Sequence, residues 1–278
     1  MAIDGISVLC PTYGRTQLLA EALECYLRQD WGGPSELIIY NDLAAQFLKL
    51  PTLDLPPHKR IEVLNSSVRE PTLGDKRNTL LREAKYPLVT YWDDDDIYLP
   101  HRLSLGFILM HNFNPDKITQ RESTREYKEW HLLPNNQMLL KYARPFGTMT
   151  ARKAAIEDVG GFPPLERLQD VAMVNKMVRA GKLPNMPQVD WMPSTIYRLH
   201  SAMAGSHVSD APNYPTTDHH NPAHNEGVRQ YIVSSVQARI QLGEEPTGTI
   251  EIKPHWKADY LSMAEVAWTL QNPRLRNA

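Results

Sequence analysis

Short apolar-rich runs alternate with amphipathic stretches along about the first hundred residues. The runs have the length and composition of buried β-strands and lie at Ile6–Cys10, Leu37–Tyr40, Ile61–Leu64 and Leu88–Trp92. Between them, the segment from Thr16 and the segment Asp75–Lys85 place leucine and alanine at helical spacing, and Pro100 is suited to open another helix. Strands that alternate with helices predict an α/β fold, with a mainly parallel sheet covered on both faces.

The second half of the chain has a weaker pattern. Residues 114–145 mix charges, prolines and aromatic side chains, and we expect little regular structure there. Residues 182–225 are rich in Pro, Ser, Asn and His, which favours long loops. Helical spacing predicts two short helices and two terminal helices, at Ala154–Val159, Asp170–Ala180, Gly227–Leu242 and Lys257–Gln271.

Composition narrows the class of protein. A chain of 278 residues with 42% hydrophobic side chains can bury a substantial core in one large domain or two small ones. The net charge of -2 does not favour nucleic acid as a partner. The stretch Lys117–Arg152, basic and aromatic, leaves nucleic-acid binding open, although we prefer a solvated face with sugar-stacking aromatic rings. Cys10 and Cys25 lie in apolar stretches and are expected to be buried free thiols.

The start of the chain has neither a basic segment nor a long apolar segment of the kind found in signal peptides. Apolar runs also stay well short of the ~18 residues that a membrane span requires. We therefore expect a cytoplasmic protein without a transmembrane segment. The terminal helices could dock on this chain or on a neighbour, so an oligomer is possible.

Polar side chains follow three of the predicted strands. They lie at Pro11–Arg15, at Asn41 and Asp42, and at Asp93–Asp96. Ligands bind at the carboxyl ends of strands in open α/β sheets, so these residues are candidates for one site. Adjacent carboxylates repel one another and need a cation, a proton or solvent, and hard oxygen ligands suit Mg²⁺ or Mn²⁺. A solvated acidic turn is the plainer alternative, but the position directly after a buried strand favours a metal site.

Segments in a fixed order along the chain resemble the family 2 glycosyltransferases. They are Ser7–Arg15, Ile38–Asp42, Gly74–Asn78, Tyr91–Pro100, Gly160–Phe162 with Gln169–Asp170, and Tyr197–His200. The resemblance implies the GT-A fold, a Rossmann-like mixed sheet flanked by helices. It implies a catalytic domain over residues 1–209, with a nucleotide-binding half at 1–100 and an acceptor half at 101–209. Residues 210–278 would form a C-terminal loop and helical extension.

The resemblance also implies a nucleoside-diphosphate sugar as donor, a UDP-sugar by family default. Asp42 would accept a hydrogen bond from the base, and Arg77 would approach the donor from a helix. The nucleotide pocket would be lined by Pro11, Thr12, Tyr13 and Arg15. Ordinary turns at the strand ends and a solvated arginine are the structural alternatives for these positions.

Within the acidic run, the resemblance assigns separate roles. Asp93 would reach the ribose or the metal, and Asp95 would contact the Mn²⁺ or Mg²⁺ ion directly. Asp94 lies between them, either in the donor site or facing away from it. For Asp96 we prefer a role as the cap of the following helix.

Asp170 matches the position of the family's catalytic base, which would remove the proton of an acceptor hydroxyl. A helix N-cap is the alternative role for Asp170. A metal ion would stabilise charge on the departing diphosphate. A base opposite a metal-held leaving group implies inversion at the sugar carbon. His200 would close the metal site, and His207 is its rival.

The prediction is therefore a metal-dependent inverting glycosyltransferase. One alternative is a nucleotidyltransferase, although the loop Pro11–Arg15 is too short and too poor in glycine for that class. Another is a non-catalytic binding protein with the same fold. The acceptor stays open among a glycan, a lipid carrier, a protein, a small molecule and a modified DNA base.

Overall fold

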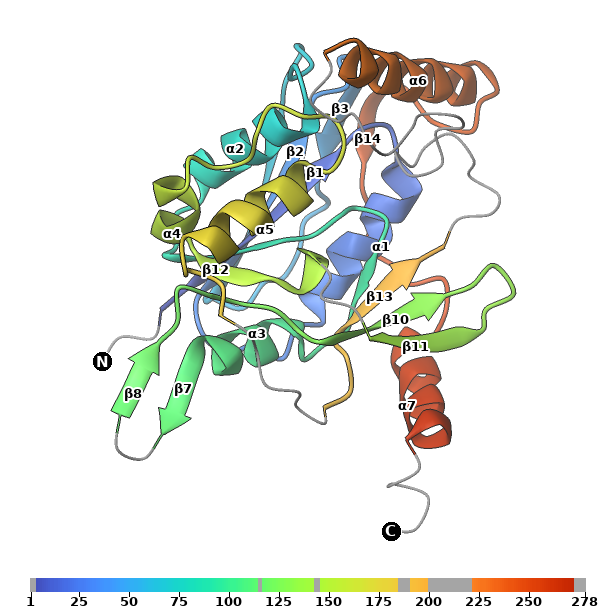
Figure 1. Ribbon diagram of the computed structural model, residues 1–278. Helices are drawn as coiled ribbons and strands as arrows, with labels where there is room; N and C mark the ends of the chain where they lie inside the picture. Colours follow the sequence, from blue (N-terminus) through green and yellow to red (C-terminus); the bar gives the residue numbers. More distant parts are fainter. Residues whose placement is uncertain (1–3, 115–116, 143–145, 185–190, 200–221, 273–278) are drawn as a thin grey trace.

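The computed structural model describes residues 4–114, 117–142, 146–184, 191–199 and 222–272 (Figure 1). A six-stranded sheet with the order β4-β2-β1-β5-β12-β9 forms its centre. The strands are β4 (Lys59–Asn65), β2 (Ser35–Asn41), β1 (Ile6–Thr12), β5 (Leu88–Tyr91), β12 (Thr150–Arg152) and β9 (Ser123–Thr124). Strands β4, β2, β1 and β5 are parallel, whereas β12 and β9 pair antiparallel. The predicted mainly parallel sheet is confirmed.

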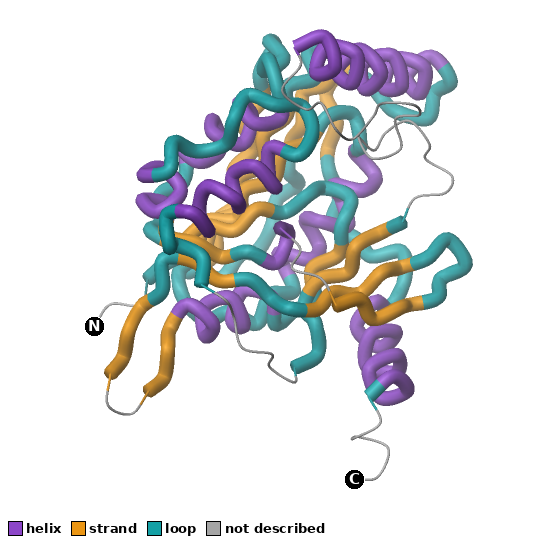
Figure 2. Tube along the Cα trace, in the orientation of Figure 1, coloured by secondary structure: helices purple, strands orange, loops and turns teal. Residues whose placement is uncertain are grey.

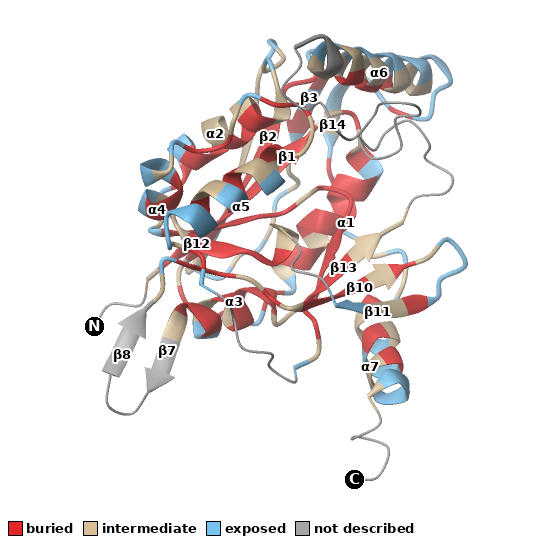
Figure 3. Ribbon diagram, in the orientation of Figure 1, coloured by how far each residue is buried: buried red, intermediate tan, exposed pale blue. Residues whose placement is uncertain are grey.

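Two helical layers cover this sheet, and each has its own apolar core. The helices are α1 (Thr16–Leu27), α2 (Leu73–Glu83), α3 (Arg102–Met110), α4 (Lys153–Asp158) and α5 (Gln169–Arg179). Because side chains alternate along a strand, Val8 packs with α1 and α3 while Leu9 packs with α2, α4 and α5. Both cores appear as buried segments in Figure 3. Burial on two faces explains why the central strands are continuously apolar.

A second sheet, with the order β11-β10-β13-β6, lies beside the first. Its strands are β11 (Met138–Tyr142), β10 (Lys128–Leu132), β13 (Thr195–Arg198) and β6 (Ile97–Tyr98). The hairpin β7 (His111–Asn114) and β8 (Lys117–Gln120) lies between β6 and β10 in the chain. The expectation of little regular structure over residues 114–145 was wrong, and strand β13 lies within residues 182–225, where long loops were expected. In β10, Trp130 and Leu132 face the core, whereas charged neighbours hide the period-two pattern. Trp130 is fully buried and is unavailable for stacking on a ligand.

The C-terminal segment packs onto both the N-terminal strands and the second sheet (Figure 2). It contains α6 (Pro222–Gln241), α7 (Tyr260–Gln271) and the unpredicted strand β14 (Gly248–Glu251), which pairs parallel with β3 (Gln46–Lys49). Glu245 accepts hydrogen bonds from the Thr16 backbone N–H and from the Gln46 amide, both at 2.9 Å. The Tyr260 hydroxyl donates to Glu21 on α1. The terminal helices therefore dock on this chain.

Among the described residues, there is no helix with the length and apolar character needed to cross a membrane. A short 3-10 helix, η1 (Phe146–Thr148), precedes β12. Two of its residues line the second cavity described below.

The two cysteines are buried and free, as predicted. Burial raises the pKa of the Cys10 thiol well above its usual range and that of Cys25 to about 12. Neither thiol forms appreciable thiolate at neutral pH, so neither should react with Ellman's reagent in the folded protein. Denaturation in guanidinium should expose both to rapid modification. Fast labelling of the native protein would contradict the packing of β1 and α1.

Candidate active site

The acidic run Asp93–Asp96 lies between β5 and β6, at the carboxyl edge of the central sheet. Arg15, from the loop after β1, contacts two of its members. Its Nη2 lies 2.6 Å from Asp94 Oδ1, and its Nη1 lies 2.6 Å from Asp95 Oδ2. Burial raises the pKa of Asp94 to about 6 against the lowering effect of Arg15. Asp94 is fully buried and lines neither of the cavities described below, and its charge is compensated by Arg15 of the neighbouring loop.

Arg77 of α2 joins the acidic run to the start of α5. Its Nη2 donates to Asp93 Oδ1 at 2.6 Å, and its Nη1 donates to Gln169 Oε1 at 3.3 Å. Burial lowers the pKa of Arg77, but Asp93 and Asp170 more than offset this effect and the net shift is upward. The Arg77 side chain is 3% exposed, so the solvated alternative for this residue is wrong.

Asp96 and Asp170 are not helix caps. Asp96 Oδ1 accepts a hydrogen bond from the Arg198 backbone N–H at 3.1 Å, while the N-cap of α3 is His101. The capping role preferred for Asp96 is therefore wrong, because this carboxylate turns toward β13. The N-cap of α5 is Leu168, in a left-handed conformation with φ 56°, so Asp170 lies in the first turn of the helix.

A first cavity opens beside the loop after β1. Of the residues predicted to bind the donor, it is lined by Pro11, Thr12, Tyr13, Arg15, Asp42 and Asp93. Arg77 and Asp94 are buried beside these residues through their contacts with Asp93 and Arg15. Sequence reasoning missed the other lining residues, which are Arg69, Glu70, Thr72, Leu73, Lys76, Glu166 and Ile232.

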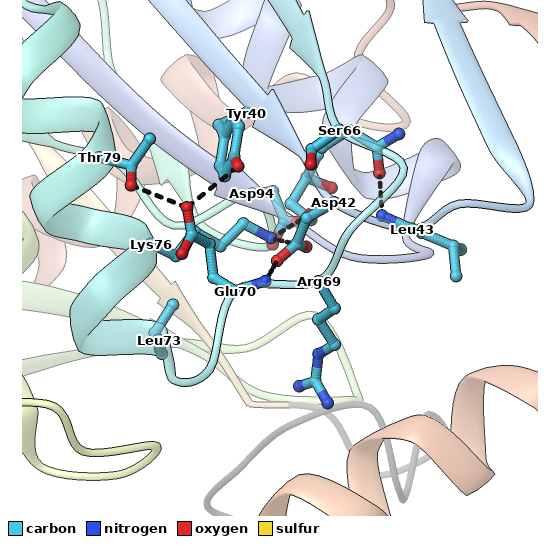
Figure 4. Close-up of polar contacts among 12 residues, drawn as sticks. Tyr40, Asp42, Leu43, Ser66, Arg69, Glu70, Leu73, Lys76, Thr79 and Asp94 are labelled. Carbon is cyan, nitrogen blue, oxygen red and sulfur yellow. Dashed lines mark hydrogen bonds and ion pairs between the residues drawn. The ribbon is translucent and has the colours of Figure 1, made fainter.

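A buried ion pair fixes the end of β2 in this cavity (Figure 4). Lys76 Nζ lies 2.5 Å from Asp42 Oδ1 and donates to the Thr12 carbonyl at 2.6 Å. Asp42 Oδ2 accepts from the Glu70 backbone N–H at 3.0 Å. Asp42 thus ties together β1, β2 and α2, and each of its oxygens has a protein partner. Lys76 lies within the segment Gly74–Asn78, but a lysine on a helix carries no sequence signal for a partner 34 residues away.

A cationic and aromatic wall closes the outer side of the first cavity. The Arg69 guanidinium lies over the Tyr13 ring, 4.5 Å from its centroid, and pairs with Glu166 at 2.6 Å. Burial raises the pKa of the Tyr13 hydroxyl, so the ring stays neutral at ordinary pH. A planar ring beside a fixed cation is suited to a base and a phosphate group.

Helix α6 also contributes to the first cavity. Ile232 lines the cavity, and Arg239 Nη1 donates to the Gly14 carbonyl at 3.0 Å. A Cβ atom at Gly14, where φ is 63°, would lie 2.5 Å from Val236 of the same helix. The glycine of the first motif is therefore required both by its left-handed backbone and by the close approach of α6.

The second cavity, of about 300 Å³, lies between the second sheet, the acidic run, η1 and the start of α5. It is lined by Asp93, Asp96, Glu129, His131, Phe146, Gly147, Asp170, Thr195 and Tyr197. Asp93 lines both cavities, so they meet at the acidic run. The resemblance anticipated Asp93 and Asp170 here. Glu129 and His131 were missed because β10 was not recognised as a strand.

The donor atoms of the acidic run suit a hard divalent cation. Among the described residues, no group of three or more His, Cys, Asp or Glu side chains is arranged to hold an ion alone. Mg²⁺ commonly takes one or two carboxylates and completes its shell with phosphate oxygens and water. The residues therefore fit a cation shared with a bound diphosphate, and they do not fit a cage made of protein alone. His200 and His207 lie outside the described residues.

A family model described as "Glycosyl transferase family 2" matches residues 7–159, so the chain belongs to this family of transferases. A curated relative is the UDP-Glc:alpha-D-GlcNAc-diphosphoundecaprenol beta-1,3-glucosyltransferase WfgD of Escherichia coli. The two are 21% identical over 140 residues, which is 50% of this chain and 51% of the relative. The chain thus spans about half the length of that relative.

Solved structures of S. aureus TarS 1-349 share the fold. The complex with UDP-GlcNAc has a TM-score of 0.56 at 15% identity, covering 85% of this chain and 73% of TarS. The complex with UDP has a TM-score of 0.50 at 14% identity, covering 85% and 72%. The predicted GT-A fold is confirmed.

Loss of the buried partner of Asp42 should destabilise the fold. Lys76→Met leaves a carboxylate that is 3% exposed without its cation, which should lower the free energy of unfolding by about 3–5 kcal/mol. Lys253→Met is the matched control, because Lys253 is 79% exposed and pairs with the exposed Glu251, so its change should stay within about 0.5 kcal/mol. Urea unfolding measures both. Equal effects of the two substitutions would contradict the proposed importance of the Lys76–Asp42 pair.

Proposed function

We propose that the chain is a metal-dependent inverting glycosyltransferase that moves a sugar from a nucleoside-diphosphate sugar to an acceptor hydroxyl. The observation that carries the proposal is the position of Asp93, which lines both cavities. One cavity has the cations and the aromatic ring suited to a nucleotide, and the other has Asp170. Family membership favours this reaction over nucleotidyl transfer.

The donor is proposed to be a UDP-sugar held in the first cavity. The names of the relatives support this choice, because WfgD uses UDP-Glc and TarS is seen with UDP-GlcNAc. Tyr13 and Asp42 would receive the nucleoside at the ends of β1 and β2. Arg15 would face the diphosphate from its position against Asp94 and Asp95, and Asp93 would lie at the junction where the sugar must cross.

In the second cavity, the Asp170 carboxylate would take the proton of the acceptor hydroxyl. The acceptor oxygen then forms a bond to the anomeric carbon while the bond from that carbon to the diphosphate oxygen breaks. The electron pair of the breaking bond leaves with the nucleoside diphosphate. Attack from the side opposite to the leaving group inverts the anomeric configuration.

A bound Mn²⁺ or Mg²⁺ ion would stabilise the negative charge that develops on the leaving diphosphate. Asp95 and Asp93 would hold the ion, with His200 as the proposed further ligand. Arg15 and Arg77 keep these two carboxylates in place through contacts of 2.6 Å. The catalytic domain would span residues 1–209, with 210–278 as a C-terminal loop and helical extension whose helix α6 contacts the loop after β1.

Asp95→Asn should reduce turnover of UDP-glucose or UDP-GlcNAc by at least about a hundredfold. The substitution removes a negative charge that would hold the divalent cation against the leaving diphosphate. Release of UDP in the presence of Mn²⁺ is the measurement. The variant should stay folded, because Arg15 keeps its contact with Asp94. Asp54→Asn, at an exposed loop position, is the control. Near-wild-type turnover of Asp95→Asn would remove this residue from the metal site.

Asp170→Asn should separate donor binding from transfer. Loss of the base should slow the reaction by about 10²–10⁴-fold, while the affinity for UDP stays the same. Transfer followed by proton NMR also reports the anomer that forms first. Asp158→Asn is the matched control, because that exposed carboxylate pairs with Lys182. Normal transfer by Asp170→Asn, or a product of retained configuration, would overturn the assignment.

A further inference from the structure

The second cavity is strongly acidic around the place where the acceptor must enter. Carboxylates reach it from different elements: Asp93 and Asp96 from the turn after β5, Glu129 from β10 and Asp170 from α5. Among the described lining residues, His131 is the one side chain that can carry a positive charge. Arg77 offsets the charge of Asp93, and burial raises the pKa of Glu129, but no Lys or Arg among the described lining residues would pair with an anionic group that enters this cavity.

Glu129 and His131 form a fixed pair on the cavity face of β10. They are two residues apart on one strand, so both side chains lie on the same face. The His131 ring nitrogen Nε2 lies 2.9 Å from Glu129 Oε1. Across the ladder, Tyr197 of β13 is the register partner of His131, with ring centroids 5.3 Å apart. The wall thus offers a carboxylate, an imidazole and an aromatic ring in defined positions.

Thr195 supplies an independent sign that a ligand belongs in this cavity. The residue is 1% exposed and lines the cavity, yet its hydroxyl has no hydrogen-bond partner among the described residues. Buried hydroxyl groups normally have a partner, because an unpaired one loses its hydration without compensation. A hydroxyl-bearing molecule in the cavity would restore that bond.

We propose that the second cavity binds the ring of an uncharged sugar, and that Glu129 and Thr195 select it. Glu129 accepts a hydrogen bond from one ring hydroxyl, and the Thr195 hydroxyl forms a hydrogen bond with another. The ring of Tyr197 provides an apolar face for the sugar. Because the described lining residues include no Lys or Arg, the cavity disfavours a phosphate or a carboxylate on that ring. This inference rests on the proposed glycosyl transfer and specifies its acceptor.

The inference is tested by measuring the binding of simple saccharides to the protein in the presence of UDP and Mn²⁺. The probes are the p-nitrophenyl glycosides of glucose, galactose, mannose and N-acetylglucosamine, with p-nitrophenyl glucuronide, glucose 6-phosphate and a single-stranded DNA oligonucleotide as anionic probes. Saturation-transfer NMR should show at least one uncharged glycoside binding about tenfold or more tightly than every anionic probe. Equal or tighter binding of an anionic probe, or no binding of any uncharged glycoside, would overturn it.

Variants identify the side chains responsible. Glu129→Ala and Thr195→Val should each weaken the best-binding glycoside by about tenfold, with the affinity for UDP unchanged. Thr195→Val keeps the shape of the side chain, so it tests the hydroxyl without disturbing the fold. Glu62→Ala, on the opposite edge strand β4, is the control and should bind as the wild type does. Wild-type affinity in both cavity variants would refute the assignment.

Failure of the inference can be told apart from failure of the proposed function. UDP binding and release of UDP from UDP-glucose are measured on the same samples. If UDP binds and the donor turns over while anionic acceptors are preferred, the choice of acceptor is wrong and the transferase stands. If neither UDP binding nor donor turnover occurs, both the proposed function and the inference about the acceptor are refuted.

Discussion

The contact of Arg15 with Asp94 and Asp95 is the interaction on which the site depends. Adjacent carboxylates at the end of a buried strand would repel one another and resist burial, yet Asp94 and Asp95 are almost fully buried. Removing the partner of a buried charge typically costs about 3–5 kcal/mol, so a guanidinium that bridges two buried carboxylates is a strong constraint. It joins the loop after β1 to the turn after β5, and Arg239 of α6 holds that same loop through the Gly14 carbonyl.

A second constraint follows from the position of Arg77. This arginine contacts Asp93 in the acidic run and Gln169 at the start of α5, and its charge acts on Asp170 as well. The residues proposed for the donor and for the base are therefore held by one buried cation. Asp93 lines both cavities, so the proposed donor and acceptor sites meet at this residue. Arg77 of α2 holds its carboxylate in place.

The sequence predicted the central sheet because β1, β2 and β5 are buried on both faces and read as short apolar runs. It also predicted the cluster at their carboxyl ends, since parallel strands bring those ends to one edge. It failed where strands are short and carry charges on one face, as β10 does with Glu129 and His131. The cap assigned to Asp96 failed because local spacing favoured the next helix, whereas the carboxylate pairs with the distant backbone of Arg198.

Contacts between residues far apart in the sequence could not be predicted from local patterns for a similar reason. Neither the helical pattern of α6 nor its composition indicates that Arg239 reaches Gly14, 225 residues earlier. Lys76 has a helix-surface pattern, but it is buried because Asp42 lies opposite. Such pairs are decided by tertiary packing, which no local pattern encodes.

In the proposed mechanism, one divalent cation is shared by the acidic run and the donor diphosphate. Titration of the protein with Mn²⁺, followed by electron paramagnetic resonance with and without UDP, tests this directly. Coupling of the two ligands is reciprocal, so UDP should tighten Mn²⁺ binding by about tenfold or more, and Mn²⁺ should tighten UDP binding by the same factor. Mn²⁺ affinity that is unchanged by UDP would contradict the shared site.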